Sequence, residues 1–201
     1  MSARLTEIDA VNEILSSLGH RKVNSIEGNT SQYTRNAASQ LNTANRTIQL
    51  VGWSFNTVPE YTLSVNAETG EIPVPGTLVE FNVPHQRQYQ LRGDRLYDRQ
   101  KQTYVFRTAL TGKAKFILDW NDLPEAAKEY ITKQAARMAY EKYVGSDETR
   151  ATLYQEEQAA KFELINYDAA GNDYTMLDSY SQPRLRGSQY IPGTIPNNPN
   201  L

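Results

Sequence analysis

The chain has 201 residues, a formal net charge of −2 at pH 7 and no cysteine. The missing thiols exclude disulfides, thiolate metal ligands and cysteine nucleophiles, and they fit folding in a reducing cytoplasm. The nearly balanced charge argues against a dedicated nucleic-acid reader, which would carry a strongly basic surface. No run approaches the roughly 18 apolar residues of a transmembrane helix, so we expect no membrane span.

Residues 1–52 are predicted to form a pair of amphipathic helices. The first helix spans Thr6–Leu18, and the second begins at Thr30 or Ser31 and ends at Gly52. The stripe of the second helix recurs at steps of three and four, which suits close packing in a bundle. Its members are Tyr33, Ala37, Leu41, Ala44, Ile48 and Val51.

Residues 53–121 are predicted to form an inserted β domain, because the hydrophobic period changes to two. The clearest alternation comes last, at Ala114, Phe116, Leu118 and Trp120. Short strands separated by turn residues are typical of an antiparallel sheet or a small barrel. Prolines should lie at strand ends or sheet edges, since a central strand cannot spare an N–H group. These prolines are Pro59, Pro73, Pro75 and Pro84.

Residues 122–166 are predicted to form a hairpin of two longer helices. The first opens with Asp122 as N-cap and Pro124 in its first turn, and Gly145 ends it. Its inward positions are Ala127, Tyr130, Ile131, Gln134, Ala135 and Met138. Such a hairpin cannot bury its stripe alone, so the N-terminal helices must cover it.

The second helix of this hairpin is expected to start at Ser146 or Asp147. Its inward positions are expected to be Ala151, Tyr154, Leu164 and Ile165. Glu156 and Glu157 are expected to face outward, as charged residues on a surface helix usually do.

Two helices therefore precede the β residues and two follow them. The predicted fold class is α+β, with a four-helix bundle closed by both halves of the chain and an antiparallel β domain inserted between helices 2 and 3.

Residues 167–201 are predicted to form an extended C-terminal arm, with a break in structure at 169–172. From Ser179 onward the sequence holds four prolines, two arginines and no acidic residue, and little of it could pack a core. Isolated anchors in an extended segment suit addition to a partner's surface, and a tail without a role is the alternative. The residues of interest are Arg184, Leu185, Arg186, Tyr190 and Ile191.

Local motifs give no support to an enzyme. The two histidines, His20 and His85, lie far apart in loop-like settings, and no HExxH, GxSxG or P-loop pattern occurs. Distant acids such as Glu80 and Asp98 could meet in any fold and carry no weight. We therefore predict no catalytic residue, no metal site and no cofactor.

One segment before the arm is locally basic and contains aromatic residues. Residues 87–101 could face a phosphate backbone or an acidic partner, or form a solvated hairpin edge that charge keeps from aggregating. Within them, Arg92-Gly93-Asp94 is better interpreted as a turn with positive φ at the glycine than as an adhesion tripeptide. The arginines are Arg87, Arg92, Arg95 and Arg99.

Several short motifs together resemble a known family. They are Ala10–Gly19 (AVNEILSSLG), Gly52–Asn56 (GWSFN), Tyr97–Arg99 (YDR), Leu123–Pro124, Gln155–Glu157 and Met176–Asp178. In this order they are similar to landmarks of the tail tubular protein A family, the head-to-tail adaptors of short-tailed, podovirus-type phages. The match spans residues 10–178 and is weakest over residues 57–95.

The resemblance implies a structural virion protein of the tail, assembled in the cytoplasm of a bacterial host. It implies a homo-oligomeric ring of twelve subunits that joins the portal protein to the tail nozzle, helps to seat the tail fibres and lets DNA pass through its bore without sequence-specific binding. In this hypothesis the arm residues named above dock on the portal. The β domain faces the nozzle and fibres, with Arg87, Arg92, Arg95 and Arg99 as its candidate contacts.

Two alternatives stay open. One is a tail-associated glycan-degrading enzyme, and the other is a DNA-binding accessory protein, against which the net charge counts.

Overall fold

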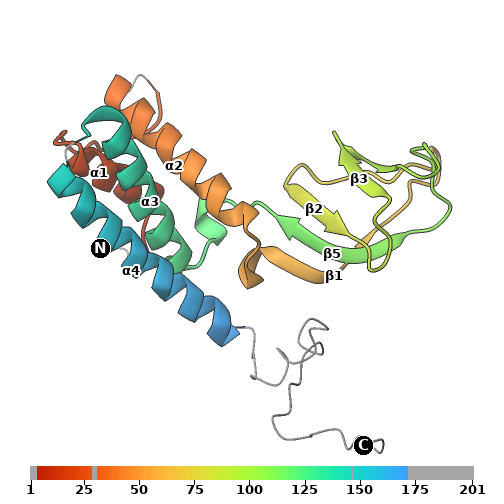
Figure 1. Cartoon of the computed structure of the whole chain (residues 1–201). Coiled ribbons are helices and arrows are strands. Elements are labelled where there is room, and N and C mark those ends of the chain that lie inside the picture. Colours follow the sequence, from red (N-terminus) through yellow and green to blue (C-terminus); the bar gives the residue numbers. More distant parts are fainter. Residues whose placement is uncertain (1–3, 29–30, 146, 172–201) are drawn as a thin grey trace, which may run out of the picture.

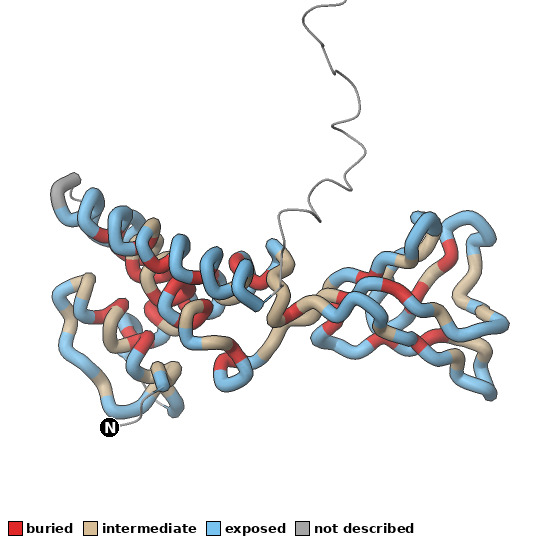
Figure 2. Tube along the Cα trace, turned by 90° about the horizontal axis from the view of Figure 1, so that it is seen from below, coloured by how far each residue is buried: buried red, intermediate tan, exposed pale blue. Residues whose placement is uncertain are grey.

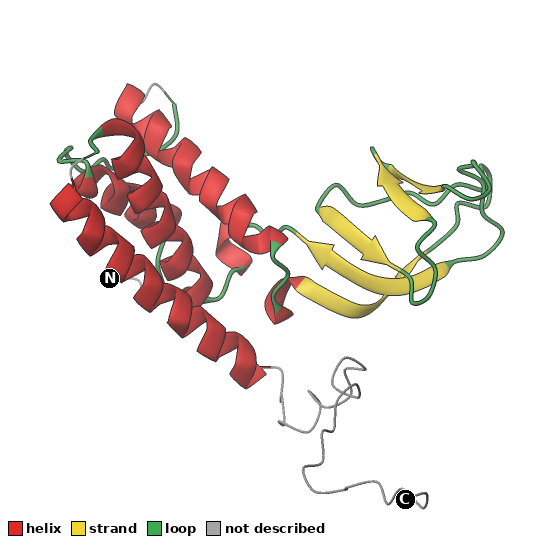
Figure 3. Ribbon diagram, viewed as in Figure 1, coloured by secondary structure: helices red, strands yellow, loops and turns green. Residues whose placement is uncertain are grey.

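The computed structural model describes residues 4–28, 31–145 and 147–171 (Figure 1). Within these ranges, helices form one body and strands form a second, joined by a neck (Figure 3). All strands lie between the second and third helices in the sequence, so the predicted α+β class is confirmed. The five residues of interest in the arm, Arg184 to Ile191, lie outside the described residues.

The elements follow in chain order. The helices are α1 (Glu7–Ser17), α2 (Gln32–Leu50), α3 (Glu125–Tyr143) and α4 (Asp147–Gly171). The strands are β1 (Thr57–Leu63), β2 (Leu78–Asn82), β3 (Tyr89–Arg92), β4 (Arg95–Asp98) and β5 (Leu110–Phe116). Two 3-10 helices, η1 (Ser54–Asn56) and η2 (Trp120–Asp122), lie where the chain passes between the bodies. None of the helices in the described ranges combines the length and apolar content that a membrane crossing requires.

The predicted starts of the first two helices are confirmed by their caps. The Thr6 hydroxyl accepts a hydrogen bond from Asp9 N at 3.2 Å, and the Asp9 carboxylate accepts one from Thr6 N at 3.3 Å. The Ser31 hydroxyl accepts a hydrogen bond from Thr34 N at 3.2 Å at the start of α2. Gly52 follows α2 with φ of +88°, a left-handed conformation that glycine adopts without strain.

Helix α3 is the centre of the bundle, because it contacts each of the other three helices. Its start was predicted incorrectly: Pro124 is the N-cap, and Asp122 belongs to η2. Short alanine side chains, buried at 127, 135, 136 and 139, let the neighbouring helices approach closely. The largest fully buried apolar side chains of this core are Ile14, Leu15, Leu41, Ile131 and Leu164.

The stripe predicted on α2 is correct in its middle and wrong at its ends. Ala37, Leu41, Ala44 and Ile48 are buried. Tyr33 is 56% exposed and Val51 is 68% exposed. The first lies in the opening turn of α2, beside the ring of His20, and the second is the C-cap residue of α2.

The inward face predicted for α4 is mostly wrong. Leu164 is buried as expected, but Ala151, Tyr154 and Ile165 are exposed. The residues that face α3 are Leu153, Glu157, Ala160 and Leu164, a spacing of four, three and four. The helix also continues to Gly171, so the break predicted at 169–172 does not occur at Ala169 to Gly171.

The β body holds a three-stranded antiparallel sheet of order β1-β5-β2 and a separate β3-β4 hairpin. Pro59 lies in edge strand β1, at an irregularity between Val58 and Tyr61, as the rule for prolines predicts. The predicted turn within Arg92-Gly93-Asp94 is confirmed, because Gly93 has φ of +61° between the two hairpin strands.

The predicted alternation at the end of the β segment is correct only for its first half. Strand β5 ends at Phe116, and Trp120 lies in η2, where it packs into the helical core. The β body has a core of its own, separate from that of the bundle (Figure 2). Its buried apolar residues are Leu63, Ile72, Val74, Leu78, Phe81, Leu96 and Ala114.

Candidate interaction surfaces

Gln49 connects the two bodies through the backbone of Leu118. This fully buried side chain, near the end of α2, accepts a hydrogen bond from Leu118 N at 2.8 Å and donates one to Leu118 O at 3.0 Å. The amide thus satisfies both backbone groups, as a neighbouring strand would. The last turn of α2 is therefore joined to the segment that follows β5.

Asn56 makes a second connection at the same place. Its buried amide nitrogen donates to Gln49 O and to Phe116 O, each at 2.9 Å. Its carbonyl oxygen accepts from Trp53 N at 2.9 Å. These bonds fix the turn between α2 and β1 against the end of β5, so the chain's exit from the bundle and its return lie side by side.

Charged groups close the neck on two further sides. Lys115 Nζ donates to Leu50 O at 2.9 Å and to Glu80 Oε2 at 2.5 Å. The pKa of Glu80 is lowered, chiefly by this hydrogen bond. Near the end of α4, Asp168 Oδ1 accepts from Ser54 N at 2.7 Å. The neck is therefore held by polar contacts that require defined geometry.

The β3-β4 hairpin carries two of the arginines of the basic segment, Arg92 and Arg95. Arg92 and Arg95 are register partners beside the turn. The Arg92 guanidinium lies 3.7 Å from the centroid of the Tyr97 ring, and that of Arg95 lies 4.7 Å from the centroid of the Tyr104 ring. The Tyr97 and Tyr104 rings are tilted by 56° to each other, with their centroids 4.8 Å apart.

Acidic groups hold one of these arginines in place. Arg95 NH1 donates to Glu71 Oε1 at 2.7 Å, and the carboxylate raises the pKa of Arg95. Arg87 and Arg99 are exposed at the opposite end of the hairpin, just before β3 and just after β4. The structure thus brings two of the four candidate arginines together on an exposed hairpin face and leaves the other two at its far end.

The bundle carries a row of ion pairs between helices. Lys133 on α3 lies 2.6 Å from Glu13 Oε1 on α1 and 3.1 Å from Glu156 Oε2 on α4. Arg137, one turn further along α3, pairs with Glu157 of α4 and, at 2.8 Å, with Glu141. These contacts join three helices.

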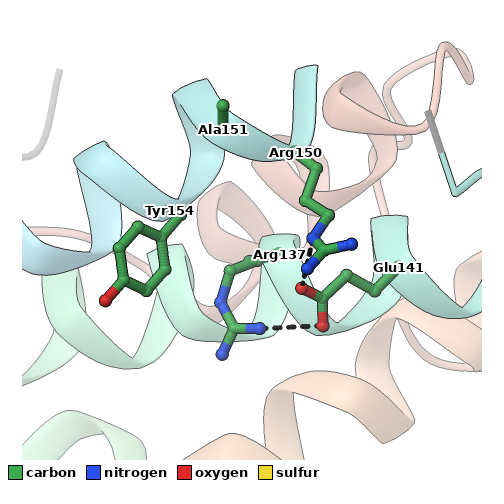
Figure 4. Close-up of a pocket in the computed structure, with 5 residues that line it drawn as sticks. All are labelled: Arg137, Glu141, Arg150, Ala151 and Tyr154. Carbon is green, nitrogen blue, oxygen red and sulfur yellow. Dashed lines mark hydrogen bonds and ion pairs between the residues drawn. The ribbon is translucent and has the colours of Figure 1, made fainter. Parts of the chain in front are cut away.

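A shallow pocket lies beside this row, between α3 and α4. Figure 4 shows Arg137 and Arg150 converging on Glu141, at 2.8 Å and 3.4 Å respectively. Ala151 and Tyr154 form the rest of the lining. Because its charged groups already pair with one another, the pocket has the character of a structural ion network.

Glu80 and Asp98, the distant acids that carry no catalytic weight in the sequence, both make structural contacts. Glu80 pairs with Lys115, and the Asp98 carboxylate accepts hydrogen bonds from Gln100 N and Lys101 N at 2.9 and 3.0 Å, which closes the turn after β4. Glu157, predicted to face outward, is buried against Arg137. Across the described ranges, no group of three or more His, Cys, Asp or Glu side chains could hold a metal ion.

Sequence reasoning missed the residues that define the neck and the α3-α4 interface. Gln49 and Asn56 are polar, so a hydropathy pattern does not indicate that they are buried. Asn56 ends the GWSFN motif, and that motif was the only available signal of its importance.

Comparison with known proteins gives two matches. A family model described as tail tubular protein matches residues 8–174. A curated relative, tail tubular protein A of Klebsiella phage KP34, is 27% identical over 189 residues, which cover 93% of this chain and 100% of the relative.

Proposed function

This chain belongs to the tail tubular protein family, and from this premise we propose that it forms an adaptor ring between the portal of the phage head and the nozzle of the tail. The chain is a structural protein of a phage tail and a component of the virion tail. Family membership supports a role in assembly in which no bond is made or broken. We further propose twelve subunits per ring and assembly in the cytoplasm of the bacterial host.

The observation that carries the proposal is the division into two bodies with separate cores, joined by a fixed neck. An adaptor must contact different partners at its two ends while keeping a defined distance between them. A polar neck with several oriented hydrogen bonds keeps the bodies in one relative orientation. Such a subunit suits a ring that keeps the head and the tail at a fixed distance and orientation.

We assign the β body to the tail side. The surface formed by Arg92, Arg95, Tyr97 and Tyr104 offers two cations, each over an aromatic ring, at a defined position. Such groups recognise acidic or aromatic protein surfaces and are enriched at interfaces. Arg87 and Arg99, at the other end of the hairpin, extend the basic character. The expected partners are the nozzle protein and the tail fibres.

We assign the arm to the portal side. Its candidate contacts are Arg184 and Arg186 for carboxylates of the portal, with Leu185, Tyr190 and Ile191 as apolar anchors. A segment that orders on binding gains specific contacts at an entropic cost.

We propose that DNA passes through the bore of the ring without being held. Residues 122–166 carry six basic and nine acidic side chains, a balance that disfavours retention of a polyanion. Each phosphate contact would add salt-dependent drag to a sliding duplex, so a lining of this charge suits passage.

The decisive experiment mixes the purified chain with purified portal rings and images the product by electron microscopy. We expect a second ring stacked on the portal, and we expect it to be lost when residues 179–201 are deleted. A matched control replaces the same residues with a glycine-serine segment of equal length, which keeps the chain length and removes the anchors. Stacking that survives both changes would leave the adaptor role intact and the arm assignment wrong. Absence of stacking by the full chain would contradict the adaptor.

A further inference from the structure

Helix α4 exposes a second apolar face in addition to the one that packs on α3. Tyr154 is 53% exposed, Phe162 is 62% exposed and Ile165 is 44% exposed. Successive helical turns bring these three residues to one side of the helix, with the exposed Ala151 and Ala159 between and beside them. We call this set the α4 outer face. Isolated exposed apolar residues are normal, but a stripe at helical spacing marks a contact surface.

Helix α2 presents a groove on its own outward side, here called the α2 groove. It has a volume of about 520 Å³ and is open to solvent. Small side chains form its centre and an arginine stands toward each end. The lining residues are Ile26, Arg35, Ala38, Ser39, Asn42, Thr43 and Arg46. Small residues let another helix approach closely.

The two surfaces lie on opposite sides of the bundle. In Figure 1, α2 and α4 flank α3 from opposite sides, in agreement with the contacts that each makes with α3. A surface on one side that fits a surface on the other side produces head-to-tail contacts, which continue into a ring if the rotation between copies closes.

One charge on each surface is suited to pairing across the contact. Helix α2 has two arginines and no acidic residue. On α4, Lys161 and Glu163 are the sequence neighbours of Phe162, whereas Glu156, Glu157 and Asp168 already bind Lys133, Arg137 and Ser54 N. Arg46, in the groove, and Glu163, next to Phe162, make no ion pair within the described part of the chain. An approaching second copy would therefore meet opposite charge at the rim of an apolar contact.

We propose that the α4 outer face of one copy occupies the α2 groove of the next copy, with Phe162 against the small residues Ala38, Ser39 and Asn42. This inference rests on the proposed ring and names the surfaces that build it. The occupant is a second copy of this chain, because the chain itself carries both complementary surfaces on opposite sides.

The absence of native cysteine allows a direct test by cross-linking. Ser39→Cys and Ala159→Cys place one thiol on each surface with little change in side-chain size. The two full-length variants are mixed, alone and with portal rings, and oxidised. We expect a disulfide-linked dimer from the mixture at a yield at least tenfold above that of either variant alone. A mixture of Ser39→Cys with Ala67→Cys, an exposed position in the β body, measures random collision.

Three results would overturn the proposal. One is efficient linking of Ala159→Cys to itself, which indicates a symmetric contact. Another is a mixed yield no greater than that of the collision control. The third is a chain that stays monomeric at every concentration, with and without portal rings.

A second measurement separates this inference from the adaptor role. Phe162→Arg should weaken self-association measured by sedimentation at least tenfold, whereas Tyr167→Arg, at an exposed aromatic position on another side of α4, should leave it unchanged. Circular dichroism verifies that both variants fold. If Phe162→Arg still forms rings on the portal, the proposed contact is wrong and the adaptor stands. If the cross-link forms but no ring stacks on the portal, the contact stands and the adaptor is wrong.

Discussion

Glu157 is a buried charged residue on the side of α4 that faces α3. Its side chain is 5% exposed and pairs with Arg137, which is itself 20% exposed. The guanidinium also binds Glu141, so two carboxylates share one cation and the pKa of Arg137 is raised, chiefly by the hydrogen bond to Glu157. Removing one partner from such a buried ion pair leaves the charge of the other partner without its counter-charge.

We predict that Glu157→Gln lowers the free energy of unfolding by about 1–3 kcal/mol, because a charge-assisted bond is lost where water cannot replace it. In a chain of this length, each kcal/mol corresponds to about 2–4 °C in Tm. Thermal unfolding followed by circular dichroism measures the change. The adjacent Glu156→Gln serves as control and should cost less than about 1 kcal/mol, because Glu156 is 45% exposed. Equal losses in the two variants would contradict the assignment.

Lys133 makes stability depend on pH in the alkaline range. Burial lowers its pKa, but hydrogen bonds to Glu13 and Glu156 outweigh burial and raise the pKa from 10.5 to about 12. A lysine whose pKa is higher in the folded state stabilises the fold fully below the unfolded value, and this contribution is lost as pH rises through the folded value. The shift corresponds to about 2 kcal/mol, which solvent screening reduces to roughly 1 kcal/mol.

The corresponding prediction compares the wild type with Lys133→Met by urea unfolding at a series of pH values. We expect the difference in unfolding free energy to be constant below pH 10.5 and to shrink by roughly 1 kcal/mol as pH approaches 12. Comparing the two proteins cancels the titration of the other lysines and the tyrosines. A difference that is independent of pH throughout would show that the ion pairs add nothing to stability.

At the scale of elements, one of the contacts that hold the neck is made by a glutamine that takes the place of a strand partner. We predict that Gln49→Leu, which keeps the volume, costs about 2–4 kcal/mol, because Leu118 N–H and C=O lose their partners in a buried place. Urea unfolding measures the loss, and hydrogen exchange at the Leu118 amide locates it. Asn45→Ala is the control, because it removes only the bond from Gln49 Nε2 to Asn45 Oδ1. Unchanged protection of the Leu118 amide in Gln49→Leu would contradict this account.

The sheet has one position where any side chain is excluded. A Cβ added at Gly112 in β5 would lie 2.5 Å from Asn82 O of β2. We predict that Gly112→Ala lowers the free energy of unfolding by about 1–3 kcal/mol, since the backbone of β2 must move. Gly76→Ala is the matched control: nothing lies within 4 Å of its added Cβ, and the change should be neutral or slightly stabilising. Thermal unfolding of both variants tests the prediction, and equal Tm values would refute it.

Elements whose signals are local could be predicted well. The capping residues Thr6 and Ser31, the glycine that follows α2 and the turn at Gly93 all act within a few residues. The face of α4 could not, because Leu153 with Leu164 and Tyr154 with Ile165 both have helical spacing. Only the position of α3 decides which pair is buried. Glu157 is buried because Arg137 lies opposite it on another helix, and periodicity contains no such information.

At the scale of the whole molecule, the order of the strands in the sheet could not be predicted from sequence patterns. β1 and β5 are neighbours although more than forty residues separate them, and β2 pairs with the other edge of β5. Contacts of this kind depend on long-range pairing. The hairpin surface likewise combines a local and a long-range feature. Gly93 predicts the turn that brings Arg92 and Arg95 together. The contact of the Arg95 guanidinium with the Tyr104 ring requires the folded β body, so it could not be predicted.

The placement of β1 and β5 also determines how the molecule would respond to mechanical force. Both connections between the bodies run through these two strands, which are hydrogen-bonded to each other. Tension that pulls the β body away from the helices is carried by β1 and β5 at the same time. The hydrogen bonds between these two strands are therefore not sheared. The load passes instead to the contacts that hold the neck, among them the carboxamides of Gln49 and Asn56. Under such a pull these bonds are where the subunit should begin to yield.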